Sequence, residues 1–278
     1  RRVLFRSVIY DTMTVGENLA FPLKNRGVAR AEVDARVRQI ADLLDLTPYL
    51  NRKATRLTAD AKQKISLGRG LVRSDVAAVL FDEPLTVIDP ELKWQLRSKL
   101  KALHRELDLT MIYVTHDQTE ALTFADTVVV MHDGRVVQSG TPAELFDKPA
   151  HTFVGYFIGS PGMNIVPAEV SGHEARIDGH VIGLHRNYGV LPAGKKIEIG
   201  VRPEFVDVAP PASGLLSATI ERIDDLGRIQ FARVRVGNTK LAARVPPGFS
   251  VSGDTAGLVF NPAYVHVYAD SHLVEGVA

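Results

Sequence analysis

Two acidic residues, Asp82 and Glu83, directly follow an apolar run over residues 76–81. A short apolar run without alternation indicates a buried parallel strand, and ligands bind at the carboxyl edge of an open parallel sheet. Adjacent strand residues point to opposite faces, so the two carboxylates can have different roles. We expect Asp82 to hold Mg²⁺, directly or through water, and Glu83 to orient and deprotonate an attacking water. A surface turn is the alternative for such a pair.

Two further polar residues support the chemical interpretation. Asp89 lies seven residues after Asp82, and His116 ends the next apolar run, residues 110–116. A histidine at a strand end can hydrogen-bond a γ-phosphate and hold a water in line for attack. On its own His116 would favour a structural role, but beside the acidic pair it predicts a phosphate-hydrolysing site.

Helices and strands alternate around these residues. Apolar spacing predicts helices over residues 14–23, 29–46 and 90–107, and Thr58 can cap another that continues through Leu71 and Val72. The apolar face of the second helix consists of Val33, Val37, Ile40, Leu43 and Leu44. Gly68 and Gly70 each cost about 1 kcal/mol relative to alanine inside a helix, which suggests close helix packing. The alternation with buried strands predicts an α/β layer with a parallel sheet.

The pattern changes in the second half of the chain. Residues 127–140 predict a hairpin that turns at Asp133-Gly134, and residues 141–147 predict a short helix. Beyond residues 159–167 the helical period fades, and short alternating segments are separated by Gly, Pro and Asn turns. We expect a small all-β barrel or sandwich domain over residues 158–278, after an α/β domain over residues 8–157.

Composition narrows the range of functions. A net charge of +1 without long runs of like charge argues against a nucleic-acid partner. The absence of cysteine excludes disulfides and Cys-based metal sites, which suits a reducing compartment. No apolar run approaches the length of a membrane span, so a membrane role would be peripheral.

The first seven residues, "RRVLFRS", need separate treatment. They can be read as the in-frame translation of a sequencing-adaptor oligonucleotide joined to a truncated gene, and we expect residues 1–7 to be non-native. A genuine basic N-terminus is the alternative.

Asp82-Glu83, the loop at Asp89, His116 and the helix over residues 57–73 together resemble the second half of an ATP-binding cassette ATPase domain. The likeness runs from about Val8 to the end of the chain, and it implies an α/β fold of the P-loop NTPase type. Residues 159–167 and 199–208 resemble parts of the OB-type (TOBE-like) β domain of ATPases from sugar and polyol importers. In that group the β domain contributes to dimer contacts and regulation.

The resemblance also implies cofactors and partners. The cofactors are ATP and Mg²⁺, and the partners are a second homologous ATPase subunit, membrane permease subunits and, indirectly, an extracytoplasmic substrate-binding protein. The location would be peripheral, at the cytoplasmic face of the inner membrane. The helix over residues 29–46 would belong to the helical subdomain that meets the permease, although we expect Val37 and Ile40 to be ordinary core.

The chain departs from the family pattern in its phosphate-binding loop. No G-x-x-x-x-G-K-[ST] pattern precedes the Asp-Glu strand. The nearest match, residues 189–196, lies in the β domain, ends in Lys196 and leads into a strand, so we reject it. Phe5 stands where the glutamine of the glutamine loop is expected. We expect truncation to have removed the P-loop and glutamine loop, so this chain alone should bind ATP poorly.

The second departure lies at the start of the helix over residues 57–73. The family signature is a Leu-Ser-Gly-Gly-Gln run that closes over the ATP of the partner subunit, and glycine lets its backbone amides approach the phosphate. Here Thr58 keeps a hydroxyl, Ala59 adds a methyl, Asp60 adds a negative charge, and Ala61 replaces glutamine. Two unit charges about 4 Å apart repel by roughly 1 to 4 kcal/mol. Asp60 can itself take the place of the phosphate at the helix N-terminus.

We therefore expect an ATPase subunit for import of a sugar or polyol, forming one half of an asymmetric pair. The site that contains Asp82, Glu83 and His116 would hydrolyse ATP, and the site closed by Thr58 to Ala61 would be slow. The run "LTADA" resembles that of a glycerol-importer ATPase. The alternatives are a homodimeric sugar-importer ATPase with a variant signature, a non-transport regulatory or binding module derived from a cassette, and an inactive fragment.

Overall fold

The computed structural model describes residues 2–4, 9–73, 76–86, 88–107, 110–227, 229–249 and 253–277. The expected glutamine-loop position, Phe5, and most of the suspected adaptor segment lie outside these residues. The chain divides into two compact units, Arg1–Ala125 and Asp126–Ala278. Among the described residues, no helix is long and apolar enough to cross a membrane.

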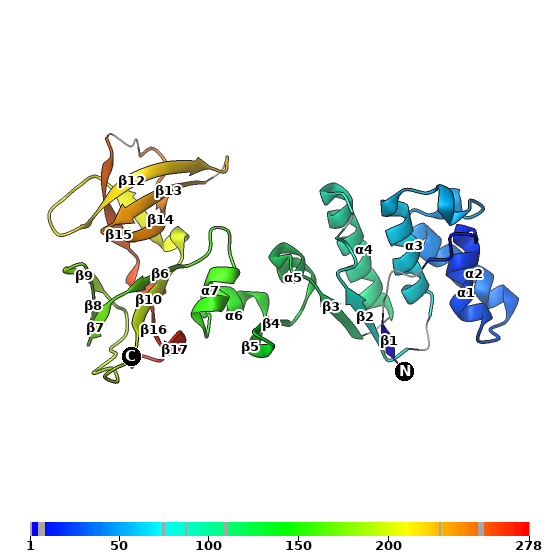
Figure 1. Cartoon of the computed structure of the whole chain (residues 1–278), viewed down its shortest axis with the longest axis horizontal. Helices are drawn as coiled ribbons and strands as arrows, with labels where there is room; N and C mark the ends of the chain where they lie inside the picture. Colours follow the sequence, from blue (N-terminus) through cyan, green and yellow to red (C-terminus); the bar gives the residue numbers. More distant parts are fainter. Residues whose placement is uncertain are drawn as a thin grey trace. The chain divides into compact units, whose positions relative to one another are not determined.

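The first four helices of the first unit begin and end close to the predicted positions, whereas the fifth and the two 3-10 helices were not predicted (Figure 1). The helices are α1 (Val15–Lys24), α2 (Arg30–Leu43), α3 (Ala59–Leu71), α4 (Pro90–Leu107) and α5 (Gln118–Phe124), with short 3-10 helices η1 (Thr47–Tyr49) and η2 (Ala54–Arg56) between α2 and α3. Thr14 caps α1 through a reciprocal capping box with Glu17. Val37 and Ile40 are buried in the core, as predicted.

The close packing predicted at Gly68 is confirmed. A Cβ at this position would lie 2.4 Å from Leu19 Cδ2 on α1 and 3.2 Å from Ile40 Cγ2 on α2. Glycine is therefore what allows α3 to pass so close to both helices.

The sheet of the first unit contains three parallel strands in the order β1 (Arg2–Leu4), β2 (Ala78–Asp82) and β3 (Thr110–Val114). The parallel α/β arrangement is confirmed, and the backbone of residues 2–4 takes part in it. One prediction was wrong: the strand over residues 110–116 was expected to be buried, but Ile112 and Val114 are 49% and 54% exposed. In the described sheet β3 is an edge strand, and one of its faces remains open.

The second unit begins at Asp126, and the domain boundary expected between residues 157 and 158 stays a prediction. The second unit includes the hairpin of β4 (Val128–His132) and β5 (Arg135–Gly140), followed by α6 (Pro142–Asp147) and α7 (Thr152–Phe157). The hairpin turns at Asp133 and Gly134 as predicted, both with positive φ. Tyr268 Oη donates to Pro149 O at 2.9 Å, one of the contacts that join these helices to the β domain.

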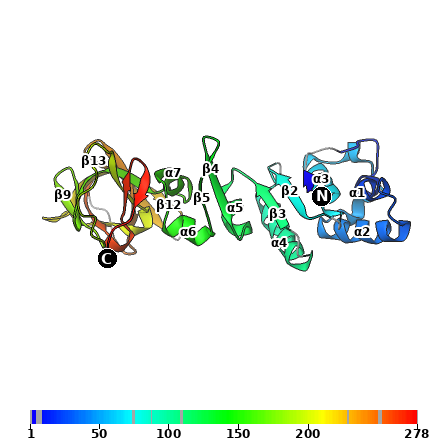
Figure 2. The same cartoon turned by 90° about the horizontal axis from the view of Figure 1, so that it is seen from below.

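The β domain contains a closed barrel, which confirms the all-β prediction. Its strand order is β11 (Val206–Ala209), β14 (Thr239–Val245), β13 (Gln230–Val236), β12 (Leu216–Asp225) and β15 (Thr255–Phe260), and the strands curve around a common centre (Figure 2). A four-stranded sheet has the order β17 (His272–Val274), β16 (His266–Ala269), β10 (Ile197–Val201) and β6 (Asn164–Pro167). A three-stranded sheet contains β7 (Glu169–Ser171), β8 (Glu174–Ile177) and β9 (His180–Gly183). The 3-10 helices η3 (Pro203–Phe205) and η4 (Pro262–Tyr264) connect strands.

Candidate functional site

The acidic pair and His116 lie at the carboxyl edge of the parallel sheet, as their positions predict. β2 ends at Asp82, and the amide of Glu83 donates to Val114 O, the last residue of β3, at 2.9 Å. This bond aligns the loops that follow the two strands, so Glu83 and His116 meet. Asp82 and Glu83 are both exposed.

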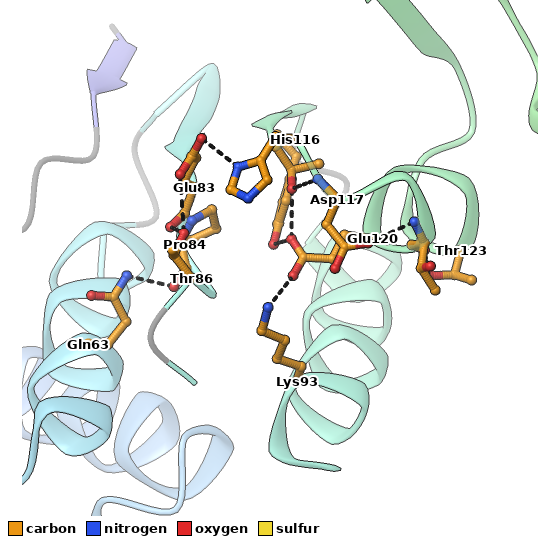
Figure 3. Close-up of polar contacts among 12 residues, drawn as sticks. Gln63, Glu83, Pro84, Thr86, Lys93, His116, Asp117, Glu120 and Thr123 are labelled. Atoms are coloured by element: carbon orange, nitrogen blue, oxygen red, sulfur yellow. Dashed lines mark hydrogen bonds and ion pairs between the residues drawn. The ribbon is translucent and has the colours of Figure 1, made fainter. Parts of the chain in front are cut away.

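Glu83 departs from the predicted strand geometry. Its φ is +46°, a left-handed conformation that costs a non-glycine residue on the order of 1–3 kcal/mol and that clusters at functional sites. The alternation of strand side chains therefore does not set the direction of Glu83, and the expected division onto opposite faces does not apply. The turn conformation directs its carboxylate toward His116 instead (Figure 3).

Glu83 and His116 form a direct pair. Glu83 Oε1 lies 2.8 Å from His116 Nδ1, and Thr86 Oγ1 lies 3.3 Å from Glu83 Oε2. The bond to His116 lowers the pKa of Glu83, and the bond to Glu83 raises the pKa of His116. The side chains are 44% and 71% exposed, so solvent screens the pair and its contribution to stability is small. The geometry places a carboxylate next to an imidazole, and both side chains are open to solvent.

Asp89, whose loop carries part of the family resemblance and so implies contact with nucleotide, lies just before α4. Its carbonyl accepts from the amide of Lys93 at 2.8 Å, and its side chain is exposed. The structure thus places Asp89 at the start of a helix, and its role toward nucleotide remains a prediction.

The four residues of the altered signature form the beginning of α3. Thr58 caps the helix by accepting from the amide of Ala61 at 3.3 Å. Asp60 Oδ2 lies 3.7 Å from the ammonium of Lys64, one turn later, while Asp60 Oδ1 is buried and has no hydrogen-bond partner in the described part of the chain. A carboxylate therefore already complements the positive end of this helix.

The beginning of α3 is also connected to the loop that follows Glu83. Gln63 Nε2 donates to Pro84 O at 2.7 Å (Figure 3). On the same turn of α3, Lys62 Nζ pairs with Asp11 at 2.8 Å. Sequence reasoning missed Gln63, because a glutamine on a helix has no local feature that reveals a contact 21 residues away.

A buried carboxylate, Glu120, was also missed. Its side chain on α5 is 3% exposed and contacts Tyr113, Thr115 and Lys93. The available signal was weak: Glu120 lies four residues after His116, in a short polar segment that gives no sign of burial.

The metal prediction rests on Asp82 alone. The described residues contain no group of three or more His, Cys, Asp or Glu side chains that could hold a metal ion. Mg²⁺ usually takes one or two protein carboxylates and completes its shell with phosphate oxygens and water. An exposed Asp82 at the strand end fits that shared mode of binding.

An exposed carboxylate, a Glu-His pair at the edge of a parallel sheet and a following β-barrel fit an ATP-binding cassette domain joined to an OB-type domain. Residues 159–206 match the model of the MalK OB fold domain, and residues 199–268 match that of the TOBE domain. The chain is 39% identical to the trehalose/maltose import ATP-binding protein MalK of Thermococcus litoralis, over 96% of this chain and 75% of that protein. It is 45% identical to the sn-glycerol-3-phosphate import ATP-binding protein UgpC 3 of Rhizobium etli, over 82% of this chain and 63% of that protein. The chain belongs to the family of import ATP-binding proteins of ATP-binding cassette transporters.

Proposed function

We propose that this chain is part of an ATP-hydrolysing subunit that energises import of a sugar or polyol through a membrane permease. The Glu83–His116 pair is the observation that supports the proposal, because a carboxylate and an imidazole lie in contact at the ligand-binding edge of the sheet. The names of the relatives support import of a sugar or a phosphorylated polyol. The more specific expectation of glycerol as the cargo remains a prediction.

Each site residue has a distinct role in this proposal. Asp82 would hold Mg²⁺ together with the nucleotide phosphates, and the bound metal would supply positive charge that offsets the charge developing during phosphoryl transfer. Glu83 accepts a proton from the attacking water, while His116 holds the γ-phosphate and the water in line. Asp89, just before α4, contacts the nucleotide. The subunit acts at the cytoplasmic face of the inner membrane, with permease subunits and an extracytoplasmic binding protein as partners.

The altered signature makes the ATPase pair asymmetric. The carboxylate of Asp60 lies at the helix end where the phosphate of the partner subunit's nucleotide would bind. Two like charges about 4 Å apart repel by roughly 1 to 4 kcal/mol. This repulsion lowers the equilibrium constant for closure of the pair by about one to three powers of ten. Lys64 offsets part of this charge at 3.7 Å. The site closed by residues 58–61 is therefore the slower one, and the second ATPase subunit is a different chain.

The test is ATP hydrolysis by the importer assembled from the gene product that contains this chain, its partner ATPase and the permease. The printed sequence has no G-x-x-x-x-G-K-[ST] pattern ahead of β2, so the assay uses the complete gene product. Glu83→Gln should remove nearly all hydrolysis, and the equivalent substitution in the partner should have a mild effect. Equal losses would contradict asymmetry, and full activity of Glu83→Gln would contradict the proposed base.

Asp60→Gly provides the matched variant for the signature. Removal of the carboxylate should raise hydrolysis at the slow site at least threefold, measured in the background of Glu83→Gln so that only that site contributes. Asp34→Gly on α2 is the control, since it removes an exposed carboxylate elsewhere in the same unit.

A further inference from the structure

Glu120 is a buried carboxylate in a network that no role proposed above explains. Its Oε2 accepts from Tyr113 Oη at 2.9 Å and from Thr115 Oγ1 at 3.0 Å, and its Oε1 lies 3.2 Å from Lys93 Nζ. Figure 3 shows Lys93 and Glu120 directed toward one another beneath the His116 loop. A buried charge is tolerated only where its oxygens are paired in this way, so the positions of its partners are tightly constrained.

This network fixes both chain neighbours of His116. Thr115 donates its hydroxyl to Glu120 and accepts from the amide of Asp117 at 3.0 Å. Asp117 Oδ1 in turn accepts from the amides of Thr119 and Glu120, at 2.8 and 3.2 Å, and so caps α5. The imidazole itself is 71% exposed. Its direction is therefore set by the segments on either side of it and by Glu83, since little packing surrounds the ring.

Lys93 extends the network to the helix that follows Asp89. Its ammonium reaches Glu120, while its amide donates to Asp89 O in the first turn of α4. One residue thus connects the Asp89 end of α4 to the segment that carries His116.

We propose that Glu120 is a positioning residue for His116: through Thr115 and Lys93 it holds the imidazole against Glu83 and ties that position to the start of α4 at Asp89. The inference rests on the proposed function, since His116 and Glu83 act in hydrolysis only if the chain belongs to an ATPase.

Thr115→Val is the most direct test, because valine has nearly the same shape and the change alters no charge. If Thr115 transmits the position of Glu120, the contact between Glu83 and His116 loosens. The raised pKa of His116, followed by NMR of its ring in this chain, should then move back toward the ordinary value. In the assembled importer kcat should fall at least tenfold, with the KM for ATP within twofold of the parent. Thr123→Val is the matched control, because in the described part of the chain the Thr123 hydroxyl bonds only a carbonyl of its own helix, Thr119 O, at 2.5 Å.

Lys93→Met gives a second test of positioning, through the sign of the change in the His116 pKa. Loss of a nearby positive charge would by itself raise the pKa of His116, whereas loss of its contact with Glu83 lowers it. The proposal expects a lower pKa in Lys93→Met. Lys99→Met on the same helix removes an exposed ion pair with Asp45 and should leave the His116 titration and kcat unchanged.

The two readouts keep this inference distinct from the proposed function. An unchanged His116 titration in Thr115→Val, or a raised pKa in Lys93→Met, overturns the positioning role whatever the importer does. An unchanged kcat in Thr115→Val, measured well below its unfolding temperature, also overturns it, since a merely structural residue would lower stability alone. If Glu83→Gln hydrolyses ATP normally, the proposed function fails, and the NMR result still decides whether Glu120 holds His116.

Discussion

At the scale of single residues, the site depends on one strained backbone conformation. Glu83 occupies a left-handed position that a side chain seldom adopts, and this turn directs its carboxylate to the imidazole of His116. A longer β2 would instead place Glu83 on one face of the sheet. The left-handed turn is thus the feature that separates Glu83 from Asp82 in direction and brings its carboxylate into contact with His116.

The titration of His116 should depend on Glu83. The pKa of Glu83 is lowered, so its share of the interaction is present above the ordinary glutamate pKa and is lost as pH falls through the folded value. The pKa of His116 is raised, so its share is present below the ordinary histidine pKa and is lost as pH rises through the folded value. The pair is therefore fully charged between these two folded-state pKa values. Glu83→Gln should lower the His116 pKa measured by NMR, and Glu17→Gln, which removes the capping carboxylate of α1, should not.

The positions of Asp82, Glu83 and His116 could be predicted because the carboxyl ends of parallel strands meet at one edge. The direction of Glu83 could not, because it depends on a turn conformation that sequence periodicity does not encode. Glu120 was missed for a related reason. Its partners come from the end of β3 (Tyr113), the loop after β3 (Thr115) and α4 (Lys93), and folding brings them together.

At the scale of elements, α3 joins the altered signature to the core. Its N-terminal turn carries Thr58 and Asp60, Gln63 reaches the Glu83 loop, and Gly68 lies against α1 and α2. The helix was predictable from its cap and apolar spacing. Only its glycines suggested that α3 passes close to other helices. Glycine is unfavourable inside a helix, so its presence there indicates that a larger side chain would not fit.

Gly68→Ala should destabilise the first unit although alanine is the better helix former. The gain in propensity is about 1 kcal/mol, whereas overpacking a filled core costs about 1–3 kcal/mol. The new methyl would lie 2.4 Å from Leu19 Cδ2 and 3.0 Å from Leu44 Cδ1, and both leucines are fully buried. We expect a net loss of about 1 kcal/mol in the free energy of unfolding, measured by denaturant titration. Ser66→Ala, two residues earlier on α3, removes a buried hydroxyl that has no hydrogen-bond partner among the residues the structure describes, and should be neutral or stabilising. Equal effects of the two changes would show that Gly68 packs loosely.

At the scale of the whole molecule, the chain contains two units with separate hydrophobic clusters. One cluster runs from Val15 to Leu103, and the other runs from Val166 to Val267. The change in sequence periodicity predicts a domain boundary after the short helices α6 and α7, whereas these helices belong to the second compact unit. Those helices read as a continuation of the α/β pattern, because nothing local reveals that Arg202 of the β domain binds their carbonyls.

Arg202 should be a main determinant of stability in the second unit. Its guanidinium is buried, stacks on the Phe146 ring at 3.8 Å, and donates to Phe146 O at 2.8 Å and to Ile158 O. Arg202→Met would leave these carbonyls unpaired at a cost of about 2–4 kcal/mol in the free energy of unfolding. Arg202→Lys keeps the charge but loses the contacts of the planar guanidinium. Its free energy of unfolding should therefore lie between those of the parent and Arg202→Met.

The single tryptophan, Trp94, lies in the first unit and lets the two units be followed separately. Because each unit has its own hydrophobic cluster, Arg202→Met should lower the denaturant midpoint of the β-strand amides in hydrogen exchange and leave the midpoint of Trp94 fluorescence in place. Arg176→Met, which removes an exposed ion pair in the same unit, should shift neither signal appreciably. An equal shift of both signals in Arg202→Met would mean that the two clusters unfold as one cooperative unit, and Gly68→Ala would then lower the midpoint of the β-strand amides as well.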